Sequence, residues 1–136
     1  MNHRNAQEVI KDFYKYFNEA ASDKLFALIA DDIVHQINYG EVMFGKDEFI
    51  KYVTTSMNHC KEHVTDCILM TGENNRSVAA KFTTIGKYFH TDQSAIPAKG
   101  QNYELSVINY FEVENGKIVT ARCWYDENAW IQQVTR

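Results

Sequence analysis

The hydrophobic pattern changes its period near residue 62, and this change constrains the fold more than any other feature of the chain. Before that point, apolar residues recur at the spacing of one buried helix face. After it, they alternate with polar residues at every second position, as in strands with one buried face. Helices followed by strands predict an α+β fold in which the helices pack against a single sheet.

Three helices are expected in the N-terminal half. The first covers residues 5–20, with Asn5 as its N-cap. A short second helix begins near Ser22, and a strand follows from about Ile33. A third helix opens at Asp47 and ends before the period changes.

The second half is expected to form an antiparallel meander of four strands, over residues 62–73, 76–89, 101–114 and 117–127. The dipeptide Asn115-Gly116 indicates a type I′ turn, because both of its central positions need positive φ. Together with the strand near Ile33, these strands predict a curved, mostly antiparallel sheet that encloses a pocket under the helices. One domain over residues 1–136 is expected, since chains of about 100–150 residues usually form a single core.

The composition favours a small-molecule pocket over a nucleic-acid or membrane surface. Eight tyrosines, eight phenylalanines and two tryptophans exceed what a small core needs, so some of them are free to line a cavity. The net charge is −4 and the basic residues are dispersed, which excludes the basic footprint of nucleic-acid binding. No apolar run approaches the roughly 18 residues of a membrane span.

The cysteines and the first residues predict a cytoplasmic protein without a metal or other cofactor. Cys60, Cys67 and Cys123 are odd in number and lack metal-ligand spacing, which indicates reduced thiols. The start of the chain, residues 1–5, has no apolar stretch of the kind found in signal peptides.

Several short segments carry a resemblance to a known family: Phe17-Asn18, Ala27–Asp32, Val34–Gly40, Gly45, Thr91-Asp92, Gly100–Tyr103, Asn115–Ile118 and Trp130. In this order they resemble ketosteroid-isomerase-related, SnoaL-like proteins of the nuclear-transport-factor-2-like superfamily. The resemblance covers nearly the whole chain and implies a cone-shaped, cystatin-like barrel. That superfamily includes isomerases, cyclases, epoxide hydrolases and non-enzymatic binding proteins, so the resemblance specifies the fold more narrowly than the reaction.

Steroid isomerases of this class use a tyrosine on the first helix, a first-strand aspartate that moves the proton and a protonated aspartic acid on a late strand. The resemblance places these roles on Phe13, on either Ile37 or Asn38, and on Asn109. None of the residues present can play the corresponding role of phenol donor or carboxylic acid. The resemblance therefore implies a chemistry other than steroid isomerisation by those residues.

Three other groups remain as catalytic candidates. His35 lies two residues before the position of the family's base, on the same strand face, and imidazole titrates near neutral pH. Asn109 can donate an N–H to a developing oxyanion, and Tyr16, one helical turn after Phe13, can supply a phenol. The alternatives are a core histidine bonded to a carbonyl, an amide that bridges polar groups, and an aromatic that only packs.

Strand alternation predicts a mostly apolar cavity wall, because alternate residues share a face. The ligand-binding residues expected from it and from the resemblance are Phe13, Ile37, Asn38, Phe82, Tyr88, Gln101, Tyr103, Val107, Cys123 and Tyr125. The irregular segment 88–100 is expected to cover the mouth of the pocket, with a solvated hairpin loop as the alternative.

The sequence thus favours an acid–base enzyme of isomerase, cyclase or hydratase type that acts on an apolar, oxygen-bearing small molecule. The alternative is a dimeric module that binds a small ligand without chemistry. The outer sheet face carries Ile108, Tyr110 and Trp124 by the same alternation, and a homodimer through this face is expected with either function.

Overall fold

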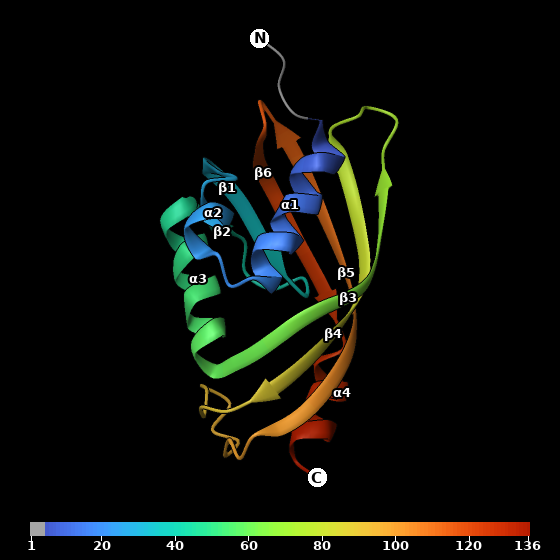
Figure 1. The fold of residues 1–136 in the computed structure, drawn as a ribbon. Coiled ribbons are helices and arrows are strands. Elements are labelled where there is room, and N and C mark those ends of the chain that lie inside the picture. Colours follow the sequence, from blue (N-terminus) through green and yellow to red (C-terminus); the bar gives the residue numbers. More distant parts are fainter. Residues whose placement is uncertain (1–4) are drawn as a thin grey trace.

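The computed structural model describes residues 5–136 as an α+β fold with its helices against one curved sheet (Figure 1). Residues 1–4, which hold most of the segment in which a signal peptide was sought, lie outside the described residues. In chain order the elements are α1 (Ala6–Asn18), α2 (Ser22–Phe26), β1 (Ile29–Ile37), β2 (Met43–Phe44), α3 (Lys46–His59), β3 (Cys60–Thr71), β4 (Ser77–Tyr88), β5 (Gln101–Glu114), β6 (Lys117–Tyr125) and α4 (Glu127–Val134).

The six strands are ordered β2-β1-β6-β5-β4-β3. All neighbours are antiparallel except β1 and β6, which run parallel. The sheet is curved but open, because its edge strands β2 and β3 do not pair with each other. Helices α1, α2 and α3 lie on its concave side, while α4 and the loop between β4 and β5 lie at the lower end in Figure 1. The α+β class and the curved, mostly antiparallel sheet are confirmed.

Helix α1 begins where the sequence predicts it. The side chain of Asn5 accepts a hydrogen bond from the backbone N–H of Glu8 at 2.9 Å, which satisfies one of the free amides of the first turn. Val9 and Ile10 are fully buried, so the apolar stripe faces the sheet. This packing holds α1 across the inner face of β3, β4 and β5.

The turns and three shifts of register, one each in the β1–β6, β3–β4 and β5–β6 pairs, contribute to the shape of the sheet. Asn115 and Gly116 both have positive φ, 53° and 75°, as the type I′ turn requires. Strand β3 contains a bulge that the alternation did not predict, with Asp66 at φ 55° and a shift of register between Thr65 and Ile68. A bulge increases local bend and twist and changes which residues face inward beyond it.

Two boundaries differ from the sequence-based expectation. Strand β1 begins at Ile29 rather than near Ile33, because Ile29 pairs with Ile118 of β6 and is 1% exposed in the core. A fourth helix, α4, follows the last strand and was not expected. The carboxylate of Asp126 caps it by accepting the N–H of Ala129 at 3.1 Å.

Helix α4 covers the unpaired edge of the first part of β5. Strand β6 pairs with β5 only from Val107 onward, so the first part of β5 has no strand on that side. There the side-chain amide of Gln133 donates to the carbonyl of Glu104 at 2.9 Å and its oxygen accepts the N–H of Glu104 at 2.8 Å. One amide side chain thereby replaces a neighbouring strand for that residue.

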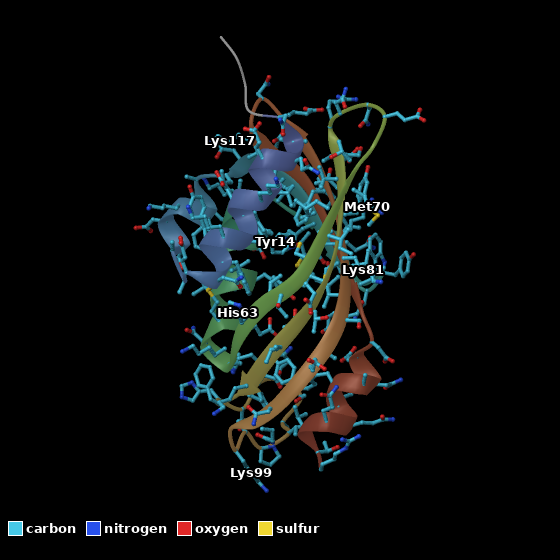
Figure 2. The ribbon with its side chains drawn as sticks, turned by 45° about the vertical axis from the view of Figure 1, so that its right-hand side comes forward. Tyr14, His63, Met70, Lys81, Lys99 and Lys117 are labelled. Atoms are coloured by element: carbon cyan, nitrogen blue, oxygen red, sulfur yellow. The ribbon has the colours of Figure 1, made fainter. Side chains whose placement is uncertain are left out.

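The convex face of the sheet carries a row of residues in register across four strands: Ile68, Lys81, Ile108 and Trp124. Figure 2 labels Lys81 on this face, away from α1. Ile108 is 47% exposed, whereas Tyr110 is half-buried. A homodimer through this face stays a prediction. Within residues 5–136, no helix has both the length and the apolar character needed to cross a bilayer.

Candidate functional site

A cavity of about 590 Å³ lies between the inner face of the sheet and helices α1 and α3. Its size, and a wall in which aromatic and aliphatic surface exceeds polar surface, are typical of small-molecule sites. A shallower hollow of about 340 Å³ lies between Asn5, Arg76 and Glu114 and has no aromatic lining. The larger cavity is therefore the candidate site.

The inner end of the cavity contains a hydrogen-bonded pair, Asn109 of β5 and Tyr14 of α1, which we call the deep pair. The side-chain N–H of Asn109 donates to the hydroxyl of Tyr14 at 2.9 Å. The side-chain oxygen of Asn109 is buried and has no partner among the described residues. Tyr14 is 7% exposed and packs against Phe13 and Phe82, with ring centroids 5.2 and 5.0 Å away (Figure 2).

The environment keeps the phenol of Tyr14 protonated. Burial raises its pKa well above the ordinary value, and the hydrogen bond from Asn109 opposes this rise only in part. Because its oxygen accepts from Asn109, its own proton is available to a ligand. The deep pair can therefore present a phenol O–H and an amide N–H to one oxygen atom.

On helix α1, the tyrosine that lines the cavity is Tyr14 rather than Tyr16. Tyr16 does not line the cavity, and the Lys24 ammonium lies 5.8 Å from the centroid of its ring. The resemblance placed the phenol on Phe13, one residue before Tyr14. Both of these neighbours are buried, at 8% and 7% exposure, and a sequence alignment does not indicate which of two adjacent aromatics reaches the polar partner.

His35 of β1 is buried in the wall of the same cavity, against helix α3. It is 1% exposed and packs edge-on against Phe49, at 5.2 Å between centroids, and against Tyr52, at 5.9 Å. Neither of its ring nitrogens has a hydrogen-bond partner in the described part of the protein. Burial lowers its pKa, partly opposed by Glu48, so the ring is neutral at neutral pH and can accept a proton.

The outer end of the cavity contains a second pair, Tyr103 of β5 and Glu62 of β3, which we call the mouth pair. The hydroxyl of Tyr103 donates to the Glu62 carboxylate at 2.5 Å. The two residues are not on neighbouring strands: each pairs with Gly86, on β4 between them. A Cβ at Gly86 would lie 2.2 Å from the Tyr103 ring, so the glycine allows the ring to cross the strand.

Burial is also the main cause of the pKa shifts of Glu62 and of the cavity residues Cys123 and Tyr125. It raises the pKa of the Glu62 carboxyl, and the hydrogen bond from Tyr103 opposes the rise. The pKa of the Cys123 thiol is raised to about 12, first by burial and then by the charge of Glu62. Burial likewise raises the pKa of Tyr125 to about 12, with Glu62 among the contributing charges.

Comparison with known proteins assigns the chain to a family. The sequence model of the SnoaL-like polyketide cyclase family matches residues 7–134. The chain belongs to this family. A candidate polyketide cyclase from Pseudomonas putida KT2440 has 30% identity and a TM-score of 0.89, with 96% of this chain and 98% of that one covered. A second, from Xanthomonas campestris pv. campestris, has 27% identity and a TM-score of 0.90, with 95% and 96% covered.

More distant structures confirm the fold alone. An NTF2-like protein from Burkholderia xenovorans LB400 has 14% identity and a TM-score of 0.75, with 98% of each chain covered. This SnoaL-like chain therefore has the fold of the nuclear-transport-factor-2-like superfamily, as its sequence motifs indicated. None of the curated proteins matches it.

Six of the expected ligand-binding residues besides Tyr103 line the cavity of this SnoaL-like protein: Phe13, Ile37, Phe82, Val107, Cys123 and Tyr125. Three do not: Asn38, Tyr88 and Gln101. They are polar residues at the ends of strands, and the structure uses their polar groups to hold neighbouring segments together.

Asn38 joins the end of β1 to β6. It adopts a φ of 48°, its side-chain oxygen accepts the N–H of Tyr125 at 2.8 Å, and its own N–H donates to the carbonyl of Cys123 at 2.8 Å. Asn38 was one of the two residues, with Ile37, on which the resemblance placed the family's base. Its amide is already engaged with backbone, so Ile37 occupies the cavity side of the strand.

Tyr88 and Gln101 fasten the loop of residues 89–100. The Tyr88 hydroxyl donates to the carbonyl of Ile96 at 2.7 Å, and the Gln101 amide donates to the carbonyls of Pro97 and Val134 at 2.8 and 2.9 Å. These bonds tie the loop to the end of α4.

The fastened loop contributes polar residues to the cavity wall, including Asp92 and Ser94. The pKa of Asp92 is lowered overall: burial alone would raise it, but hydrogen bonds from Ser94 and Tyr88 favour the carboxylate. The loop thus places one ionised carboxylate at the rim. Residues 5–136 contain no cluster of histidine, cysteine and carboxylate side chains that could hold a metal ion.

Proposed function

We propose that this protein is an acid–base enzyme that isomerises or cyclises an apolar small molecule by moving a proton at a carbon next to a carbonyl group. The observation that carries the proposal is that the deep pair and the unpartnered His35 line one cavity whose wall is mainly apolar. Two hydrogen-bond donors and one proton acceptor in the same cavity are the groups that enolate formation requires. Membership of a family of polyketide cyclases supports the same class of chemistry.

Tyr14 and Asn109 hold the carbonyl oxygen of the substrate in this proposal. As a proton leaves the adjacent carbon, negative charge develops on that oxygen, and the phenol O–H and amide N–H stabilise it. Asn109 takes the place of the protonated acid of steroid isomerases, so the two donors are kept although the carboxyl group is absent. Loss of one such donor typically lowers the rate by about 10²–10³-fold.

His35 receives the proton. Its imidazole is neutral because burial lowers its pKa, and its two free nitrogens give it capacity that a structural histidine would have used on a carbonyl. The aromatic rings of Phe49 and Tyr52 keep water away from it. A base in an apolar wall is effective because the substrate carbon is also desolvated there.

The proposal is tested with 2-tetralone, an apolar ketone with an acidic C–H, in D₂O. Deuterium incorporation beside the carbonyl is followed by NMR with and without protein. We expect protein-dependent exchange that Tyr14→Phe and Asn109→Ala each reduce by about 10²-fold or more, and that His35→Ala reduces by about 10²–10⁴-fold.

Tyr16→Phe is the matched control, because Tyr16 is on the same helix but outside the cavity lining. It should leave the exchange rate unchanged. If 2-tetralone binds but exchanges no faster than in buffer, proton transfer at this site is refuted and the alternative, a module that only binds its ligand, is the better description.

A further inference from the structure

Glu62 is a cavity-facing carboxyl whose environment the proposed function does not explain. It lines the cavity, and its hydrogen-bond partner is the phenol of Tyr103. Within residues 5–136, no lysine, arginine or histidine forms an ion pair with it. A buried carboxyl without a counter-ion is costly for stability, which makes it a candidate for function.

The local fold is arranged to bring Tyr103 to this carboxyl. Glycine at position 86 of β4 allows the Tyr103 ring to lie across the strand. Any side chain at this position would occupy the place of the ring. The ring also packs against Trp130 of α4, with centroids 6.1 Å apart. Packing across β4 and against α4 therefore holds one phenol on Oε2 of Glu62, and no described residue is hydrogen-bonded to the other carboxylate oxygen.

The groups around Glu62 come from every wall of the outer cavity. Its charge acts on Tyr52 of α3, on Cys60 of β3 and on Cys123 and Tyr125 of β6, besides Tyr103. Asp92 of the loop and Glu127 of α4 add negative charge nearby, and His59 lies close to Asp92. None of these residues forms an ion pair with Glu62, and burial raises the pKa of its carboxyl, with the hydrogen bond from Tyr103 opposing the rise.

We propose that Glu62 is a second proton-transferring group of this cavity, which Tyr103 and Gly86 position to bind and protonate an oxygen of the substrate other than the one held by the deep pair. The substrate class that fits has two oxygen functions joined by an apolar framework. This assignment of a residue rests on the proposed acid–base function, but its test does not need the natural substrate.

The proton balance of the complete step is simple. His35 takes a proton from carbon, so a C–H bond breaks and the electron pair moves into the enolate. The enolate carbon then attacks the carbonyl carbon that bears the second oxygen, so a C–C bond forms and the electron pair of the C=O π bond moves to that oxygen. The carboxyl O–H of Glu62 breaks as its proton bonds to this oxygen. The substrate gains and loses no atoms, and the proton returns from His35 to Glu62 through solvent after release.

The first measurement is the titration of the carboxyl itself. Protein labelled with ¹³C at glutamate carboxyl carbons is titrated by NMR, and the Glu62 signal is identified by its absence in Glu62→Gln. We expect a midpoint above the ordinary glutamate value of 4.5. Tyr103→Phe removes the bond that favours the carboxylate, and Gly86→Ala displaces the ring, so both should raise the midpoint further.

The second measurement uses a nitrobenzisoxazole, an apolar probe that eliminates when a base removes its single ring C–H. The base gains the proton, the N–O bond breaks and a coloured cyanophenolate forms. Above its midpoint Glu62 is ionised and can act as this base. We expect the rate to rise with the same midpoint as the NMR titration, and Glu62→Gln to lower it on the order of 10²-fold.

Glu104→Gln is the matched control, since Glu104 is next to Tyr103 on β5 but its side chain is exposed on the other face. It should change neither midpoint nor rate. A Glu62 midpoint at 4.5, a wild-type probe rate equal to that of buffer, or an unchanged rate in Glu62→Gln overturns the proposal. If ketone exchange fails while these results hold, the proposed function is wrong but the proton-transferring role of Glu62 stands.

Discussion

The deep pair and the mouth pair use the same elements of chemistry in two different surroundings. Each joins a tyrosine to a polar side chain on the inner face of the sheet, at 2.9 Å between Asn109 and Tyr14 and 2.5 Å between Tyr103 and Glu62. The deep pair lies against the buried core, where Phe111 is 2% exposed. In the mouth pair Tyr103 is buried, at 3% exposure, but Glu62 is half-buried and the ring of Tyr103 packs against half-buried Trp130 of α4.

This difference indicates that the hydrogen-bond donors at the deep end are held rigidly, whereas the segments around the mouth can change conformation. Around the deep pair, packing stabilises the fold and holds two hydrogen-bond donors rigidly, as oxyanion stabilisation requires. At the mouth, a short helix and a loop held by side-chain bonds surround the carboxyl, and such segments open more readily than the core. We expect the deep end to hold the reacting carbonyl in a fixed place, and the mouth, which contains Glu62, to adapt to the second oxygen function of the substrate.

The largest expected effect is a difference between the two ends of the cavity in how much an aromatic side chain contributes to the free energy of unfolding. Phe111→Ala should lower the free energy of unfolding by about 3–5 kcal/mol, because a buried ring in contact with Phe13 and Tyr14 is removed. Trp130→Ala at the mouth should cost about 1–2 kcal/mol, since part of its surface is already in water. Urea unfolding at neutral pH measures both. Equal losses would mean that the mouth belongs to the same rigid core.

The sequence predicted polar residues of the cavity but not the residues that they contact. Asn109 and His35 were predicted from the resemblance, which gave the strand positions of the family's acid and base, and from strand alternation, which puts His35 on the same face as that base. Their protein partners could not be predicted in the same way. Tyr14 is on a helix, adjacent to another buried aromatic, and only the packed structure brings its hydroxyl to Asn109.

Glu62 was missed for two physical reasons. Its partner is two strands away, and pairwise alternation does not indicate contacts across an intervening strand. The bulge at Asp66 also changes the inward face within β3, so alternation read along the whole strand is inconsistent. The one local signal is Gly86, since a glycine inside a long strand often marks a close approach. Helix α4 was missed because eight residues carry little periodicity.

An intermediate effect is expected when stability is followed against pH. The folded-state pKa of His35 is lowered, so the unfolded chain binds more protons below about 6.5 and His35 destabilises the fold as pH falls through that range. The folded-state pKa of Glu62 is raised, so the unfolded chain loses its proton first and stability falls as pH rises above 4.5. His35→Gln should flatten the acid side, and Glu62→Gln should stabilise the protein at neutral pH but not below 4.5.

Thermal melts between pH 4 and pH 8 measure these opposite slopes. A tenfold change in proton affinity corresponds to about 1.4 kcal/mol, which is measurable for a domain of this size. Glu104→Gln is the control for the carboxyl and should run parallel to the wild type. A Glu62→Gln curve parallel to the wild type would show that the carboxyl is as well solvated in the fold as in the unfolded chain, and would remove the contrast between the two ends.

The smallest expected effect concerns the attachment of α4. Gln133→Ala removes the two hydrogen bonds to the backbone of Glu104, and it should lower stability by only about 1 kcal/mol because water can reach the freed edge of β5. Hydrogen exchange gives the sharper result. The amide of Glu104 and those of α4 should exchange faster, while the buried amides of α1 around Tyr14 stay protected. If the α1 amides accelerate equally, the two ends open together, and the mouth cannot adapt to a substrate without disturbing the deep pair.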